Sequence, residues 1–270
     1  MQSLRVVTLN LWGEQPPLDR RMAGITAELT RLRADVIGLQ EVRQIPGVLE
    51  NQAVTLATTL GMHQVFGPAT RWGNGDEGVA ILSRHPILSH QTRELPDSSP
   101  EERRVVLTAV IDHPAGKLAA ATTHLTYRLH DGLKRERQVL AAEAAVAAVP
   151  SELPRLFMGD FNATPDADEI RYLRGLHTLG SQRVFWQDAW DIRHPDQPGY
   201  TWALGNPHTE RLAWLTRERR LDYIFVGPER RDGSGRVHEV ALCCTTADET
   251  GCLPSDHYGL CADLHLADKV

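Results

Sequence analysis

The sequence predicts an α/β fold with mixed β-sheets, on the basis of two observations. Short runs of apolar and β-branched residues, which are typical of buried strands, alternate with longer segments whose apolar spacing is typical of helices. Some consecutive strand-like runs are separated by a helical segment, whereas others follow one another across a turn. A chain wound only as strand–helix–strand forms parallel sheets, so this mixture favours sheets with both parallel and antiparallel pairs.

The predicted elements of the first third already alternate in this way. Residues 5–9 form a short apolar run of the kind found in buried strands. Residues 18–33 carry apolar side chains at three- and four-residue spacing, as an amphipathic helix does. A second strand is expected at residues 35–40, a short helix at residues 52–60 and another strand at residues 78–82.

The middle of the chain predicts a hairpin followed by a long helix. The β-branched runs at residues 104–111 and 117–125 flank a short segment with Pro and Gly, which is typical of a turn. Residues 133–149 are rich in alanine and stop at a proline, so a helix is expected there. A strand at residues 155–158 leads into a polar segment, and residues 165–176 again have a helical pattern.

The last third predicts three more strands, at residues 221–226, 237–243 and 260–266. The polar segment at residues 203–219 has little periodicity and is expected to be a surface loop. No linker, internal repeat or low-complexity tract interrupts the sequence, so residues 1–270 are predicted to form a single domain.

Composition and charge restrict the class of protein. Hydrophobic residues make up 41% of the chain, enough for a sizeable core, and the net charge is −6. Non-specific duplex-DNA binders usually carry a basic surplus, so this balance counts against bulk affinity for nucleic acid. The four cysteines lack zinc-site spacing, a strand-like segment follows Met1 directly, and the apolar stretches are too short to span a bilayer. We therefore expect a reduced, cytoplasmic protein with no integral membrane segment.

Carboxylate, amide and imidazole side chains recur where the predicted strands begin or end. They are Asn10, Glu41, His124, Asp160, Asn162, Asp222, Asp256 and His257. Any one of them alone is explained as a turn former or as an exposed polar residue. Functional groups of α/β proteins gather on loops at strand ends, so a set of this size favours one shared site.

The oxygen-bearing members of this set suit a metal ion. Hydrolysis of a phosphoester benefits from a hard cation that neutralises charge, and hard cations take oxygen ligands. Glu41 is the first candidate for a ligand, with Asp256 and Asn10 near it.

The remaining members suit the other steps of the reaction. Asp160 is the candidate for orienting or deprotonating the attacking water. Asn162 and His257 are candidate donors to the phosphoryl oxygens. His124 is eligible as the general acid for the leaving oxygen.

Short motifs in a fixed order make the sequence similar to a known superfamily. The matching segments are Thr8-Leu9-Asn10, Leu39-Gln40-Glu41-Val42, Gly78 to Arg84, Thr123-His124-Leu125, Gly159-Asp160-Phe161-Asn162, Leu221 to Phe225 and Ser255-Asp256-His257. Together they resemble the endonuclease/exonuclease/phosphatase superfamily, which includes deoxyribonucleases, abasic-site endonucleases, neutral sphingomyelinases, inositol polyphosphate phosphatases and deadenylases. The resemblance implies a four-layer α/β/β/α sandwich, in which two mixed sheets pack face to face with helices outside and the site lies at one edge.

The resemblance also implies roles for individual residues. Glu41 would hold Mg²⁺ or Mn²⁺, with Asn10 and Asp256 close by. His257 would contact a phosphoryl oxygen and would be oriented by Asp222. The implied activity is hydrolysis of a phosphoester substrate.

Two details narrow the branch of the superfamily. His124 matches the deoxyribonuclease and sphingomyelinase branch, in which an acidic residue supports this histidine, and Glu77 and Asp76 are the candidates for that support. Abasic-site enzymes carry an acidic residue shortly after the first Asn, whereas Leu11 and Trp12 follow it here. The pattern is therefore nearest to the sphingomyelinase and deoxyribonuclease branch.

Basic and aromatic residues outside these motifs are the candidates for substrate contacts. Trp202 lies beside the polar loop and is the better candidate for packing against a substrate. Arg84 is chosen as a phosphate contact, and Arg71, Arg104 and Arg128 are further candidates at the border of the site.

Several functions remain open at this point. The leading hypothesis is a phosphodiesterase that acts on a small molecule or a lipid headgroup, and the alternative is a nuclease that acts on DNA or RNA. A phosphomonoesterase is a third hypothesis. A pseudoenzyme that serves as a binding scaffold is disfavoured, because every expected site position is filled. The number of metal ions and the oligomeric state stay open.

Overall fold

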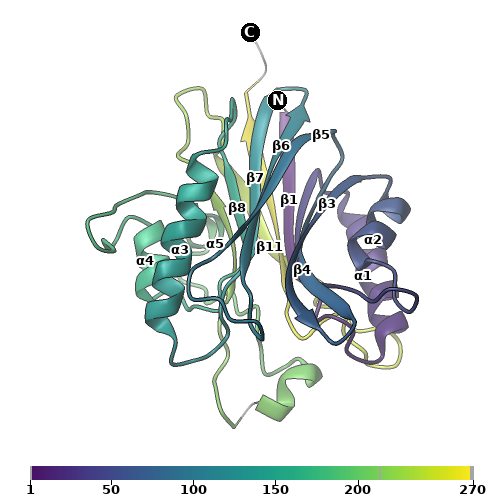
Figure 1. The fold of residues 1–270 in the computed structure, drawn as a ribbon. Coiled ribbons are helices and arrows are strands. Elements are labelled where there is room, and N and C mark those ends of the chain that lie inside the picture. The colour runs from purple at the N-terminus through teal and green to yellow at the C-terminus, as the bar shows by residue number, and fades with distance from the viewer. Residues whose placement is uncertain (1, 213, 268–270) are drawn as a thin grey trace.

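Two six-stranded β-sheets pack face to face in the computed structural model, which describes residues 2–212 and 214–267 (Figure 1). The first sheet comprises β1 (Gln2–Asn10), β2 (Val36–Gln44), β3 (His63–Trp72), β4 (Gly75–Ser83), β11 (Val237–Cys243) and β12 (Gly259–Leu266), in the order β11-β12-β1-β2-β4-β3. Helices α1 (Leu18–Leu32) and α2 (Gln52–Leu60) cover its outer face with their apolar sides.

The second sheet has its own helical cover. Its strands are β5 (Ile87–Glu94), β6 (Val105–His113), β7 (Gly116–His124), β8 (Leu156–Asp160), β9 (Gln187–Asp188) and β10 (Asp222–Val226), in the order β5-β6-β7-β8-β10-β9. Helices α3 (Gly132–Ala147) and α4 (Asp168–Leu173) pack on its outer face. The short helix α5 (Ala189–Arg193) contacts β10 and β11, and the 3-10 helix η1 (Pro207–Leu212) lies in the loop before β10. None of the helices in the described part of the chain is long and apolar enough to cross a membrane.

Both sheets are mixed, as predicted. The pairs β1–β2 and β7–β8 are parallel, and the other strand pairs in the described chain are antiparallel. Helices outside two facing sheets make four layers. The α/β/β/α sandwich that the resemblance implied is therefore confirmed.

The core between the sheets is apolar and closely packed. Val36 and Ile81 of the first sheet face the same buried cluster as Leu107 and Met158 of the second. At Gly38 the sheets approach so closely that an added Cβ would lie 2.7 Å from Cγ of Met158. This rigid double sheet is the scaffold on which the strand-end residues are held.

Three strands were not predicted from the sequence, namely β3, β5 and the two-residue β9, and all three lie at a sheet edge. In β3 most side chains are exposed or half-buried, and Gly67 and Pro68 interrupt its pattern. In β5 no side chain is fully buried. Edge strands do not need the apolar alternation that reveals a half-buried strand, so the pattern on which the prediction depended is weak there.

Strand direction brings the polar strand ends together. Strands β1, β7 and β8 finish at the end of the sandwich shown at the bottom of Figure 1, near η1 and opposite the chain termini. The sheet register places His124 beside Asp160 across the parallel pair and Asp222 beside Asp160 across the antiparallel pair. In the other sheet, Asn10 is the last residue of β1 and pairs with Gln40 of β2.

Candidate active site

Glu41 projects into the site from an irregular stretch of β2. The register of β2 against β4 shifts between Leu39 and Val42, and Glu41 between them has a φ of 50°. Bulges of this kind redirect a side chain, and a positive φ at a non-glycine residue marks a backbone held by its surroundings. Asn162, which follows β8, has the same φ of 50°. Two of the predicted site residues thus occupy strained backbone.

Asn10 connects the two sheets at the centre of the site. Its Nδ2 donates to Oε1 of Glu41 at 3.1 Å and to Oδ2 of Asp160 at 3.0 Å, while its Oδ1 accepts from the backbone N–H of Trp12 at 2.9 Å. Asn10 therefore lies beside the candidate metal position, as predicted. It presents its amide N–H₂ to Glu41, while its Oδ1 is engaged by the backbone of Trp12.

Glu41, Glu77 and Asp256 line the same pocket, and the charge of Glu41 acts on the other two carboxylates. Burial and the nearby Glu41 charge raise the pKa of Glu77 to about 7. Burial raises the pKa of Asp256 to about 7 as well, with Glu41 again contributing. Half-buried carboxylates that repel one another in this way are stabilised by a hard cation with oxygen ligands. Mg²⁺ and Mn²⁺ both fit this donor set.

A second acidic group is less suited to a metal ion. Asp160, Asp222 and His257 place donor atoms within 4.8 Å of one another. However, Nδ1 of His257 is bonded to Oδ2 of Asp222 at 2.8 Å. Burial lowers the pKa of His257, but the charges of Asp222 and Asp160 outweigh it and raise the pKa well above its ordinary value. A protonated imidazole repels a cation, so we favour the Glu41 group for the metal.

Asp160 is buried where several of these groups meet. Its Oδ1 accepts from the backbone N–H of Asn162 at 2.9 Å, and its Oδ2 lies 3.5 Å from Nε2 of His124 and 3.9 Å from Nε2 of His257. Burial and the neighbouring Asp222 raise the pKa of Asp160 to about 7. A base with a pKa near the working pH is suited to accept a proton from water.

The structure places His257 and Asp222 as the sequence predicted. Both are buried, and the hydrogen bond of Asp222 to Nδ1 leaves Nε2 of His257 facing Asp160. The backbone N–H of Asp222 donates to the hydroxyl of Thr201, which holds the start of β10. Among the described residues, Oδ1 of Asp222 has no hydrogen-bond partner.

The surroundings of His124 differ from the prediction. Its Nδ1 lies 2.9 Å from Nη1 of Arg104, not beside an acidic residue. Asp76 instead accepts a hydrogen bond from Gln44, and Arg104 occupies the position at Nδ1 where Asp76 or Glu77 was expected, so the expected carboxylate support for His124 is wrong. Burial and the Arg104 charge hold the pKa of His124 well below its ordinary value, which disfavours the general-acid role.

A pocket of about 780 Å³ opens over these residues. It is lined by Trp202, by Arg104 and Arg128, and by Arg219, which lies 5.0 Å over the Trp202 ring. Trp202 thus lies at the site, as predicted, although it is only 3% exposed.

The pocket also receives residues that the sequence analysis did not single out. They include Arg43, Trp72, Tyr127, Leu129, Leu212, Leu215 and Arg219. The last three belong to the 203–219 segment, whose described residues form a wall of the pocket rather than a plain surface loop. The run of arginines before the Asp222 motif was the available signal for Arg219.

Arg84 does not join the site. It follows the end of β4 that pairs with Val36, whereas Glu41 lies toward the other end of β2. Its Nε donates to Oδ1 of Asp35 at 3.0 Å and its Nη2 to the carbonyl of Arg33 at 2.6 Å. The prediction of Arg84 as a phosphate contact is therefore wrong, because the motif that contains it runs the full length of the strand.

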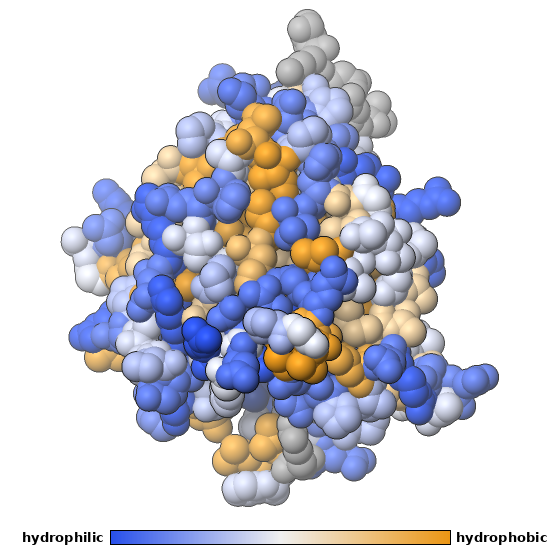
Figure 2. All heavy atoms as spheres, turned by 45° about the vertical axis from the view of Figure 1, so that its right-hand side comes forward, coloured by the Kyte–Doolittle hydropathy of each residue, from blue (hydrophilic) through white to orange (hydrophobic). Residues whose placement is uncertain are grey.

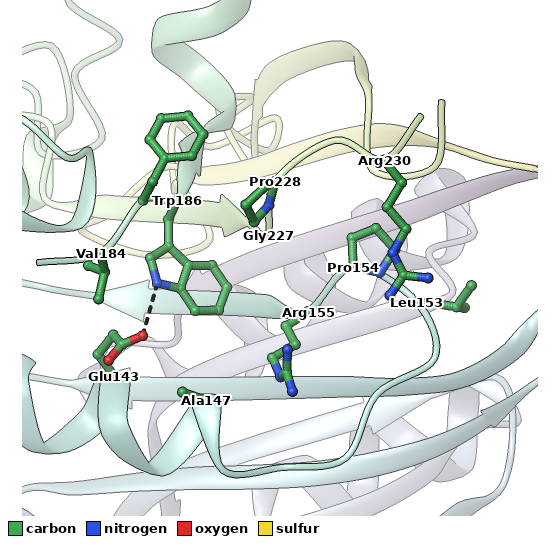
Figure 3. A pocket seen from close by; sticks show the side chains of 11 residues that line it. Glu143, Ala147, Leu153, Pro154, Arg155, Val184, Trp186, Gly227, Pro228 and Arg230 are labelled. Carbon is green, nitrogen blue, oxygen red and sulfur yellow. Dashed lines mark hydrogen bonds between the residues drawn. The ribbon is translucent and has the colours of Figure 1, made fainter. Parts of the chain in front are cut away.

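A smaller cavity, of about 400 Å³, lies at the opposite end of β8 and β10 (Figure 3). Its lining combines Trp186 with Arg155 and Arg230. Nε1 of Trp186 donates to Oε1 of Glu143 at 3.4 Å, and the Arg155 guanidinium donates to the carbonyl of Val149. These polar groups of the smaller cavity are already paired by hydrogen bonds within the protein. The carboxylates of the larger pocket instead repel one another, so the larger pocket is the better candidate for an active site.

Comparison with known sequences identifies the family. The sequence profile of the Endonuclease/Exonuclease/phosphatase family matches residues 7–257. The chain belongs to this family. The assignment confirms the resemblance seen in the motifs and agrees with the four-layer fold.

Individual relatives agree with the family assignment. An uncharacterized protein, YbhP of Escherichia coli K12, is 27% identical over 172 residues, which cover 59% of this chain and 67% of YbhP. Tyrosyl-DNA phosphodiesterase 2 of Xenopus tropicalis is 24% identical over 262 residues, which cover 95% of this chain and 65% of that protein. The family and this relative confirm the prediction of a phosphoric ester hydrolase.

A solved structure confirms the fold. The crystal structure of Danio rerio TDP2 in complex with a single-strand DNA product superposes with a TM-score of 0.77. The two chains are 21% identical, and the match covers 98% of this chain and 100% of the other.

Proposed function

We propose that this chain is a divalent-metal-dependent phosphodiesterase in which a water molecule attacks the phosphorus in line with the leaving oxygen. The observation that carries the proposal is the position of Asn10. It donates to Glu41 of the candidate metal site and to the candidate base Asp160, and so holds the two at a fixed separation. Such an arrangement suits a metal-assisted attack by water.

The metal position in this proposal is the group of Glu41, Glu77 and Asp256. Mg²⁺ or Mn²⁺ held there would neutralise the phosphoryl oxygens as negative charge develops on them. Glu41 is fixed by its bulged backbone and by the hydrogen bond from Asn10. These constraints hold its carboxylate in place before the substrate arrives.

The catalytic groups are assigned from their contacts. Asp160 orients the water and takes its proton, supported by a raised pKa near 7. His257 directs the N–H of Nε2 toward the phosphoryl oxygen, and Asp222 holds the ring from the other side. Asn162 lines the pocket and gives an amide contact to the phosphate, with one N–H bonded to the carbonyl of Leu125.

Hydrophobic side chains around the pocket support a substrate with an apolar ester group. Trp72, Tyr127, Leu129, Leu212 and Leu215 all line the pocket and are between 40% and 56% exposed. Figure 2 shows hydrophobic side chains at the lower end of a mostly hydrophilic face, the end at which Figure 1 places η1. Leucine side chains pack against aliphatic groups, whereas nucleobases favour flat rings. We therefore favour a small-molecule or lipid-headgroup phosphodiester.

A nuclease is the second candidate, and two observations favour it. The similar TDP2 structure was solved with a single-strand DNA product. Arg43, Arg128 and Arg219 line the pocket together with Trp72 and Tyr127, which is a combination suited to phosphates and stacked bases. For both candidate functions, we propose a cytoplasmic location, as the sequence predicts.

Removal of the metal is expected to stop the reaction. Excess chelator should reduce turnover of a phosphodiester to background, and added Mg²⁺ or Mn²⁺ should restore it, because the half-buried carboxylates then regain their counter-charge. The measurement uses an aryl phosphodiester, a sphingomyelin dispersion, single-stranded RNA and plasmid DNA, each with and without Mn²⁺. Full turnover in excess chelator would refute the metal assignment, and the substrate with the highest kcat/KM decides between the two candidates.

A further inference from the structure

The contact between Arg104 and His124 determines where the imidazole carries its proton. Nη1 of Arg104 lies 2.9 Å from Nδ1 of His124, and both side chains are buried. A guanidinium has only donors, so Nδ1 of His124 must accept this hydrogen bond. The proton of a neutral His124 is then on Nε2, the atom that lies 3.5 Å from Oδ2 of Asp160.

Arg104 is itself held from behind. Its Nη2 donates to Oε1 of Glu102 at 3.3 Å, and the same oxygen accepts from the hydroxyl of Thr126 at 2.6 Å. Arg128 and Lys134 approach the other oxygen of Glu102, at 3.4 Å and 3.5 Å. Glu102 is only 4% exposed, so this pairing is shielded from water. Two of the three guanidinium nitrogens of Arg104 are therefore already engaged within the protein.

We propose that Glu102 and Arg104 are positioning residues that hold His124 as the neutral tautomer with its proton on Nε2, which makes His124 a hydrogen-bond donor to the phosphate rather than a general acid. This inference rests on the proposed function for the role of the donor, but the tautomer is a property of the protein alone. A proton on Nδ1 of His124 would point at the guanidinium of Arg104. Two donors would then face each other and the hydrogen bond would be lost, so Arg104 disfavours a proton at Nδ1.

The two histidines beside Asp160 have opposite kinds of partner at Nδ1. A carboxylate, Asp222, lies behind Nδ1 of His257, and a guanidinium, Arg104, lies behind Nδ1 of His124. Both rings point Nε2 toward Oδ2 of Asp160. The same ring orientation is therefore held by a carboxylate in one histidine and by a guanidinium in the other, and only the guanidinium requires Nδ1 to be an acceptor.

The direct test is nuclear magnetic resonance of the imidazole nitrogens in the Mg²⁺-loaded wild-type protein. The chain has 12 histidines, and the His124 signals are assigned as those lost in His124→Gln. We expect Nδ1 of His124 to show the shift of an unprotonated nitrogen and Nε2 that of a protonated one. A protonated Nδ1 in the wild-type protein would overturn the proposal, whether or not any substrate is turned over.

Variants test the positioning role. Arg104→Met and Glu102→Gln should each lower kcat by about 10- to 100-fold with little change in KM, because a misplaced N–H donor of His124 reduces the rate by about that factor. In Arg104→Met the His124 nitrogen shifts should move toward those of a mixture of tautomers. Arg84→Met, which removes an arginine from the far end of β4, is the matched control and should leave both readouts unchanged.

The two variants also separate folding from positioning. If Arg104→Met does not fold, as circular dichroism and the Tm would show, Glu102→Gln retains the Arg104 side chain, removes only the carboxylate that holds it, and is judged by the same spectra. Unchanged His124 shifts and unchanged kcat in a folded Arg104→Met protein would rule out the positioning role. A large rise in KM with unchanged kcat and shifts would instead assign Arg104 to direct binding of the substrate, and would equally overturn it.

Discussion

Replacing Glu41 by glutamine is expected to abolish metal-dependent turnover while leaving the fold intact. The substitution keeps the shape of the side chain and an oxygen that can accept from Asn10, but it removes the charge that the cation needs. Loss of a metal ligand removes several kcal/mol of charge stabilisation from the transition state, so kcat/KM should fall by about 10³-fold or more. The checks are kcat/KM as a function of Mg²⁺ concentration and the Kd of Mg²⁺ from calorimetry.

A matched control separates the loss of this carboxylate from the loss of negative charge in general. Glu229 pairs with Arg236 outside the pocket, and Glu229→Gln makes the same chemical change there. It should leave turnover and the Kd of Mg²⁺ as in the wild type. Wild-type Mg²⁺ dependence in Glu41→Gln would remove Glu41 from the metal site and direct attention to the group of Asp160 and His257.

Most residues of the candidate site could be located from the sequence because they stand at strand ends, which local patterns reveal. Asn10 and Asp160 are 150 residues apart in the chain, yet each ends a buried apolar strand, and the topology of the sandwich brings them within hydrogen-bond distance. The parallel pair β7–β8 likewise places His124 beside Asp160. Buried strands have a strong apolar signal, so their ends can be located in a sequence.

The surroundings of these residues could not be predicted in the same way. The partner of His124 depends on how a neighbouring strand begins, and Arg104 stands just before β6 without any motif of its own. Arg84 shows the opposite failure, since it stands in a matching motif but at the wrong end of β4. A motif identifies the residues of a strand. It does not show which end of the strand lies at the site, and that end determines which residues can contact a substrate.

Replacing His257 by alanine is expected to have a large effect on turnover and a separate effect on stability. The substitution removes the charged donor to the phosphate, and loss of one such donor lowers kcat by about 10²- to 10³-fold. It also leaves Asp222 buried without its partner, which costs about 3–5 kcal/mol in the free energy of unfolding. Steady-state kinetics and denaturant unfolding measure the two effects.

The stability effect depends on pH in a defined direction. Because the pKa of His257 is raised in the folded protein, the folded state binds the proton more tightly than the unfolded chain does. The stabilisation is fully present below the ordinary pKa of histidine, about 6.5, and is lost as the pH rises through the raised folded value. The difference in unfolding free energy between wild type and His257→Ala should therefore shrink as the pH increases.

A double variant separates catalysis from stability at this pair. Asp222→Asn combined with His257→Ala removes the buried charge that the single variant leaves unpaired, so it should regain much of the lost stability. Turnover should stay as low as in His257→Ala, because the donor to the phosphate is still missing. If turnover returned together with stability, the loss in His257→Ala would be a consequence of local unfolding, and His257 would not act on the phosphate. If neither returned, Asp222 would have a role at the site beyond its bond to His257, for which its unpartnered Oδ1 is the available atom.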